Sequence, residues 1–83
     1  MYIRRTFGKN VKYYRFLKNY TQAKLAEKID ISPTYLSEIE RGMHSFDFDK
    51  MELLCESLGI EPFQLFVKAK DTKLPRRIDM NKK

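Results

Sequence analysis

Residues that support covalent or metal-based stability are scarce in this chain of 83 residues. Cys55 is its one cysteine and His44 its one histidine, so neither an internal disulfide nor a cysteine–histidine zinc site is available. Paired carboxylates, metal-ligand spacings and glycine-rich phosphate loops are also missing, and Cys55 lies in an apolar helical pattern without a neighbouring base. We therefore expect no enzyme, no metal site and no cofactor.

Long hydrophobic runs are missing as well. The first five residues already carry charge, and no apolar run follows them, so we expect neither a signal peptide nor a membrane span and take the cytoplasm as the default location. The length suits one small domain, and the 42% hydrophobic content is enough for one compact core. A sizeable ligand domain does not fit, so no small-molecule ligand is expected.

What the chain does have is an uneven distribution of charge. Residues 1–28 contain eight lysines and arginines and one acidic residue, whereas residues 29–66 contain two basic and eight acidic residues. Residues 67–83 are basic again, with seven lysines and arginines and two aspartates. This distribution predicts a bipolar protein whose basic side could attract a polyanion. The alternative interpretation is that the charged side chains are simply solvated at the surface.

Apolar spacing and capping residues predict a series of short helices. Apolar residues recur three and four positions apart from Phe7 to Leu17, which indicates an amphipathic first helix. Thr21 is a suitable N-cap for a second helix. Ser32 suits the N-cap of a third helix, with Pro33 at its first position and Gly42 at its end.

Two further helices are expected beyond Gly42. Asp47 suits the N-cap of a fourth helix that ends at Gly59, and Pro62 begins a short fifth one. Strand-like alternation and internal repeats are missing, and the sequence after Phe66 turns polar and basic. We therefore expect an all-α domain over residues 1–66 and a flexible basic C-terminal tail over residues 67–83.

The second and third helices form a candidate helix-turn-helix, an arrangement that binds DNA when its second helix is exposed on one side. The chain resembles the Cro/repressor (Xre-type) helix-turn-helix family. The matching segments are "G-x-x-V" at Gly8–Val11, Arg15, "TQ-x-x-LA" at Thr21–Ala26, "IS-x-x-YLS-x-IERG" at Ile31–Gly42 and "LGIEPFQLF" at Leu58–Phe66. The resemblance implies a five-helix, lambda-repressor-like domain that binds DNA, usually as a two-fold dimer. One departure is Asp30, where the family commonly has glycine in the turn.

Helical geometry separates the side chains of the third helix into two faces. At 100° per residue, Leu36, Ile39 and Glu40 lie on one side and pack inward. The opposite side carries polar residues, and Tyr35 lies on the border. Because the N-terminal end of such a helix usually enters the major groove, the candidate base contacts are Pro33, Thr34, Tyr35, Ser37 and Glu38.

Two of these candidates have alternative interpretations. Glu38 can accept a hydrogen bond from the cytosine amine and repel phosphates in a misregistered complex, or it can be an ordinary solvent-exposed residue. Tyr35 can reach a base or a phosphate through its hydroxyl, or it can be a half-buried packing aromatic.

Candidate phosphate contacts surround the second helix. The resemblance implies that Gln22 bonds a backbone phosphate, against the alternative of an unremarkable first-turn polar residue. Arg41 suits a phosphate or a guanine, and each lysine taken singly can also be merely solvated. The candidates are Thr21, Gln22, Lys12, Lys24 and Arg41.

The resemblance also implies one ion pair and one interface. An inward Glu40 needs a partner because an unpaired buried charge is costly, and Arg15 occupies the matching family position; the alternative is a solvated Glu40. By the same analogy the fourth and fifth helices form the dimer interface, although their aromatics can instead fill the monomer's own core. The interface candidates are Phe46, Phe48, Phe63 and Phe66.

Together these features predict a small transcriptional regulator that binds double-stranded DNA at a pseudo-palindromic operator as a homodimer, with residues 32–41 in the major groove. The size suits a phage-type repressor, a restriction–modification controller protein or a mobile-element regulator. The alternative is a protein-binding module of antitoxin type, which would use the basic tail to hold an acidic partner.

Overall fold

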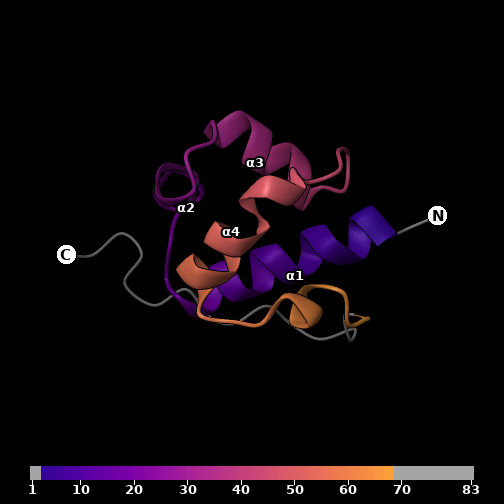
Figure 1. Cartoon of the computed structure of the whole chain (residues 1–83). Coiled ribbons are helices and arrows are strands. Elements are labelled where there is room, and N and C mark those ends of the chain that lie inside the picture. The colour runs from indigo at the N-terminus through magenta and orange to yellow at the C-terminus, as the bar shows by residue number, and fades with distance from the viewer. Residues whose placement is uncertain (1–2, 69–83) are drawn as a thin grey trace.

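The computed structural model describes residues 3–68, which fold as helices joined by short turns (Figure 1). No β-strand occurs in this part of the chain. The elements are α1 (Ile3–Leu17), α2 (Gln22–Lys28), α3 (Pro33–Glu40), the 3-10 turn η1 (Phe48–Lys50), α4 (Met51–Leu58) and the 3-10 turn η2 (Pro62–Leu65). The expected tail lies almost entirely outside the described residues.

The all-α architecture expected from the sequence is present. The fourth and fifth helices differ in detail from what the sequence predicts. The fourth helix begins with η1, because the Asp47 side chain accepts a hydrogen bond from the Asp49 backbone N–H at 3.0 Å and closes a tight turn before α4. The expected fifth helix is η2, a single 3-10 turn of four residues. The described part of the chain therefore has four α-helices rather than five.

Side-chain caps define the start of α2 and of α3. Thr21 Oγ1 accepts from the Lys24 N–H, and Ser32 Oγ accepts from the Tyr35 N–H, both at 3.0 Å. Between the two helices Asp30 has φ 59°, a left-handed conformation that costs a residue with a Cβ about 1–2 kcal/mol. The Lys50 ammonium donates to the Asp30 carbonyl at 3.1 Å and supports this turn from outside.

The core lies between the helices and η2, and each of α1, α2, α3, α4 and η2 contributes side chains to it. α1 packs against α3 and η2, and α3 also packs against α2. Fully buried aliphatic side chains fill the space between these elements: Val11, Leu25, Ile29, Leu36, Ile39, Leu54 and Leu65. The buried Asn10 amide donates to the carbonyls of Leu65 and Val67 at 2.9 and 2.8 Å, which holds the end of the domain against α1.

Gly8 marks the closest approach of α1 to α3. A Cβ built on Gly8 would meet the backbone of α3, with the Glu40 carbonyl oxygen at 2.8 Å and the Ile39 carbonyl oxygen closer still. Any larger residue would force the two helices apart. The glycine therefore sets how deeply the C-terminal end of α3 lies on α1.

Gly8→Ala should destabilise the fold by about 1–3 kcal/mol, because the added methyl group has no space between α1 and the α3 backbone. The measurement is urea unfolding followed by circular dichroism. Lys9→Ala, at the exposed neighbouring position, is the matched control and should change stability by less than about 0.5 kcal/mol. Equal stabilities for the two variants would contradict the proposed close contact.

Candidate nucleic-acid interface

α2, the turn at residues 29–32 and α3 form a helix-turn-helix. The inward side chains of α3 are Leu36 and Ile39, which are 0% and 1% exposed, so this face is fully committed to the core. At the other side of the N-terminal end, Pro33 and Thr34 are exposed. One side of α3 is therefore packed against the core, and the other side of its N-terminal end is accessible to solvent.

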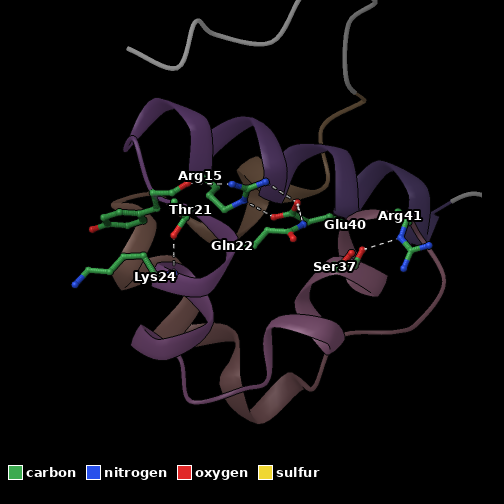
Figure 2. Close-up of polar contacts among 8 residues, drawn as sticks. Arg15, Thr21, Gln22, Lys24, Ser37, Glu40 and Arg41 are labelled. Carbon is green, nitrogen blue, oxygen red and sulfur yellow. Dashed lines mark hydrogen bonds and ion pairs between the residues drawn. The ribbon is translucent and has the colours of Figure 1, made fainter. Parts of the chain in front are cut away.

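A buried polar network holds α3 in this position (Figure 2). Arg15 and Glu40 are 4% and 7% exposed, and the structure brings them together in a two-pronged ion pair. Arg15 Nε donates to Glu40 Oε2 at 2.7 Å, and Arg15 Nη2 donates to Glu40 Oε1 at 2.9 Å. Arg15 Nη1 also donates to the Tyr20 carbonyl at 3.0 Å. One guanidinium thus joins α1, the α1–α2 turn and α3.

Gln22 extends this network to α2. Its side-chain Nε2 donates to Glu40 Oε1 at 3.0 Å, and the residue is half-buried (Figure 2). A side-chain amide has two N–H donors, so this bond leaves one of them for another partner. Gln22, a candidate phosphate contact, is therefore oriented by Glu40. Neither the sequence patterns nor the family resemblance predicted this bond.

Tyr35 and Glu38 are less free than helical geometry suggested. The Tyr35 hydroxyl donates to the Ser45 carbonyl at 3.1 Å, and Tyr35 also packs against the core. Glu38 Oε1 lies 3.0 Å from His44 Nε2, and Ser37 beside it is half-buried. Both outward side chains thus contact the loop that follows α3.

The candidate phosphate contacts occupy three places. Thr21 and Lys24 lie together at the start of α2 (Figure 2). Arg41 is exposed just beyond α3, where its Nε donates to the Ser37 carbonyl at 3.4 Å. Lys12 is half-buried on α1, with its ammonium 5.9 Å from the centroid of the Phe16 ring. The structure therefore groups Thr21 and Lys24 with Gln22, and leaves Lys12 on a separate helix.

The four candidate interface aromatics divide into two groups. Phe48 and Phe63 are 83% and 66% exposed. Phe46 and Phe66 pack against Phe7 of α1, with ring centroids 5.6 and 5.3 Å apart, and Phe66 is still 47% exposed. Phe48 and Phe63 are thus large apolar side chains with little contact inside the domain.

Acidic side chains gather on a different part of the surface. A groove of about 820 Å³ runs between α4 and η2, and four carboxylates line it: Asp49, Glu52, Glu56 and Glu61. The exposed basic residues of the described region lie mainly on α1 and α2. The charge separation read from the sequence is thus also a separation between structural elements.

Cys55, on α4, is a free and buried cysteine. Burial raises the pKa of the Cys55 thiol, and the nearby Glu61 carboxylate raises it further, so the thiol stays protonated and is a weak nucleophile. Within residues 3–68, no group of three or more histidine, cysteine, aspartate or glutamate side chains could hold a metal ion. In the same region no helix is both long enough and apolar enough to cross a bilayer.

The helix-turn-helix family HTH_3 matches residues 11–65. The chain belongs to this Xre-type helix-turn-helix family. Among curated proteins it is similar to "Control protein C.BamHI" of Bacillus amyloliquefaciens, with 41% identity over 64 residues that span 76% of this chain and 79% of the relative. The family match thus covers α2, α3 and the network residues that hold them.

Two solved structures share the fold. The restriction-modification controller protein C.AhdI from Aeromonas hydrophila superposes with a TM-score of 0.71 and 28% identity, over 76% of this chain and 96% of that one. SinR, a master regulator for biofilm formation solved in complex with DNA, gives a TM-score of 0.66 and 32% identity, over 71% of this chain and 95% of that one. The family resemblance seen in the sequence motifs is therefore confirmed.

Arg15→Met should destabilise the protein by about 3–5 kcal/mol, because it leaves the Glu40 carboxylate buried without its partner. The double variant Arg15→Met with Glu40→Leu should recover most of this loss, since replacing a buried ion pair by apolar side chains is often neutral. Chemical unfolding measures both. Exposed Arg41→Ala is the control, and an Arg15→Met variant as stable as this control would contradict the role assigned to the pair.

Proposed function

We propose that this protein is a sequence-specific DNA-binding transcriptional regulator that places α3 in the major groove of double-stranded DNA. The observation that carries the proposal is the network of Arg15, Glu40 and Gln22. It fixes α2 and α3 on α1 and leaves the N-terminal end of α3 exposed. Membership of the helix-turn-helix family supports the same function.

The base contacts would come from the exposed start of α3. Thr34 can donate to or accept from a base edge, and its methyl group can contact thymine. Pro33 has no N–H and would contribute shape alone. Ser37 and Glu38 follow on the polar side of the helix, and Tyr35 lies at its border. Glu38 suits the cytosine amine. These five residues are our proposed readers.

Attraction to DNA would come from basic and polar groups outside α3. Gln22 has one amide N–H left for a phosphate, and Glu40 holds that amide in a fixed direction. Thr21 and Lys24 lie beside it, and Arg41 lies at the far end of α3. Lys12 would act from α1.

A DNA-binding regulator works in the compartment that holds its DNA. This agrees with the cytoplasmic location, which stays a prediction.

A homodimer is the proposed functional form. One copy presents one α3, whereas two copies related by a two-fold axis would read two half-sites about one helical turn apart. Phe48 and Phe63 are exposed near the groove between α4 and η2, and an interface there would cover them. Phe66 would extend it, while Phe46 stays mainly a core residue.

The similarity to C.BamHI and C.AhdI, which are described as control or controller proteins, favours a controller-type regulator over the other contexts suggested by the sequence.

We propose no catalytic activity, because both relatives are regulators and the Cys55 thiol is held protonated. The alternative of a protein partner for the basic tail concerns residues that lie mostly outside the described region.

Selection of bound duplexes from a random pool should recover a pseudo-palindrome. Two variants then distinguish recognition of the bases from general attraction to the phosphates. Thr34→Ala should change the preferred base at one position of each half-site, at a cost of about 1–3 kcal/mol on the original site. Lys24→Ala should weaken binding to all duplexes alike and reduce the slope of log K against log salt by about 0.9.

No enrichment in the selection would contradict the proposed function itself. An unchanged base preference in Thr34→Ala, with the fold intact by circular dichroism, would instead remove Thr34 as a reader and leave DNA binding standing.

Phe63→Glu should convert the protein from dimer to monomer at micromolar concentration, as measured by sedimentation equilibrium. An isologous interface brings the same acidic groove of both copies together, so the wild-type dimer should tighten with added salt, opposite to DNA binding. Glu27→Lys, on α2 and outside the groove, is the control and should leave the mass unchanged. A wild-type monomer under all salt conditions would rule out the dimer.

A further inference from the structure

The loop that follows α3 contacts the outward side of that helix. His44 Nε2 lies 3.0 Å from Glu38 Oε1, and the next residue, Ser45, accepts the hydroxyl hydrogen bond of Tyr35 at 3.1 Å. Tyr35 and Glu38 are three residues apart and therefore lie on one side of α3. Two consecutive loop residues thus hold two of the proposed base-reading side chains.

The loop is itself attached to α1. Arg4 Nη1 donates to the Met43 carbonyl at 3.3 Å. Gly42 has φ 77°, and a Cβ on it would lie 3.0 Å from Arg5 Cα, so the loop leaves α3 in close contact with α1. The position of His44 is therefore set by two helices.

The charged and titratable groups around His44 come from these same two helices. Glu38 and Tyr35 face it from α3, and the centroids of the Tyr35 and His44 rings are 6.2 Å apart. Arg4 of α1 lines a cavity of about 210 Å³ together with His44, and apart from Ser45 the rest of that lining is apolar. Among residues 3–68, Glu38 is the one carboxylate recorded within ion-pair distance of His44.

The charge of the Glu38–His44 pair depends on the protonation of the imidazole. A neutral imidazole with its hydrogen on Nε2 donates to Glu38 and leaves the pair at one negative charge, whereas an imidazolium makes the pair neutral. Histidine is the side chain whose charge ordinarily changes between pH 5 and 8. A carboxylate on the DNA-facing side repels phosphates, and an imidazolium beside it cancels that repulsion.

We propose, building on the proposed function, that His44 is a positioning residue for DNA recognition. It holds Glu38 in its reading direction at neutral pH, and its protonation removes the negative charge that disfavours non-specific DNA. Discrimination between a specific and an unrelated duplex should therefore decrease as the pH falls. His44 is the one histidine in the chain, and variants at this position distinguish its contribution from that of the α-amino group, which also changes charge in this range.

The test compares two duplexes, one recovered by selection and one of the same composition with shuffled sequence, at pH 7.2 and pH 5.5 and constant ionic strength. The measured ratio is the Kd for the shuffled duplex divided by the Kd for the selected duplex. For the wild-type protein this ratio should fall about two- to fivefold on acidification, the size expected for a partly exposed ion pair. His44→Ala should lower the ratio already at pH 7.2. Glu38→Gln should also lower the ratio at pH 7.2, since it removes the negative charge that disfavours unrelated DNA.

His44→Gln separates position from charge. Its amide nitrogen can donate to Glu38 from nearly the same place, so it should restore the pH 7.2 ratio that His44→Ala loses, and its inability to gain a proton should abolish the pH response. Thermal melts at both pH values check that each variant is folded. A pH response that persists in His44→Gln, or an unchanged ratio in His44→Ala, would overturn the proposal. Absence of binding to either duplex would instead contradict the proposed function.

Discussion

The buried ion pair between Arg15 and Glu40 is the interaction on which the proposed recognition surface depends. Two charges removed from water are tolerated only when they meet with good geometry and their remaining hydrogen-bonding groups are satisfied. Here both carboxylate oxygens and all three guanidinium nitrogens have partners, supplied by α1, the turn before α2, α2 and α3. Moving α3 relative to α1 would break several of these bonds at once. The pair therefore makes the direction of α3 a fixed property of the fold.

This constraint explains how a basic protein can have two glutamates in the helix proposed to read DNA. Glu40 pairs with Arg15 in the buried network that holds α3, while Glu38 faces outward beside His44. In the proposed complex, attraction would come instead from α1 and α2, which carry most of the exposed lysines and arginines of residues 3–68. Four acidic residues of the same region line the groove at α4 and η2. Selectivity and attraction are thus assigned to different elements of a domain with a single small core.

Much of this arrangement could be predicted from the sequence, because it depends on local signals or on the motifs of the family that the chain resembles. The caps Thr21 and Ser32 and the apolar spacing define α1, α2 and α3, and the family motif pairs Arg15 with Glu40. The two 3-10 turns were expected as helix because three or four residues carry no distinguishing period. The bonds of Gln22, Tyr35 and His44 could not be foreseen, since they depend on how helices cross and on the path of the chain after Gly42.

In the proposed complex, the network of Arg15, Glu40 and Gln22 presents α3 to DNA, and the α4–η2 side faces away from it. Amide chemical shifts of the ¹⁵N-labelled full chain, followed during titration with a selected duplex, test it most directly. We expect the largest changes at Thr21, Gln22 and residues 33–41, and small changes around the acidic groove. Changes concentrated at the α4–η2 groove, with α3 unaffected, would contradict it.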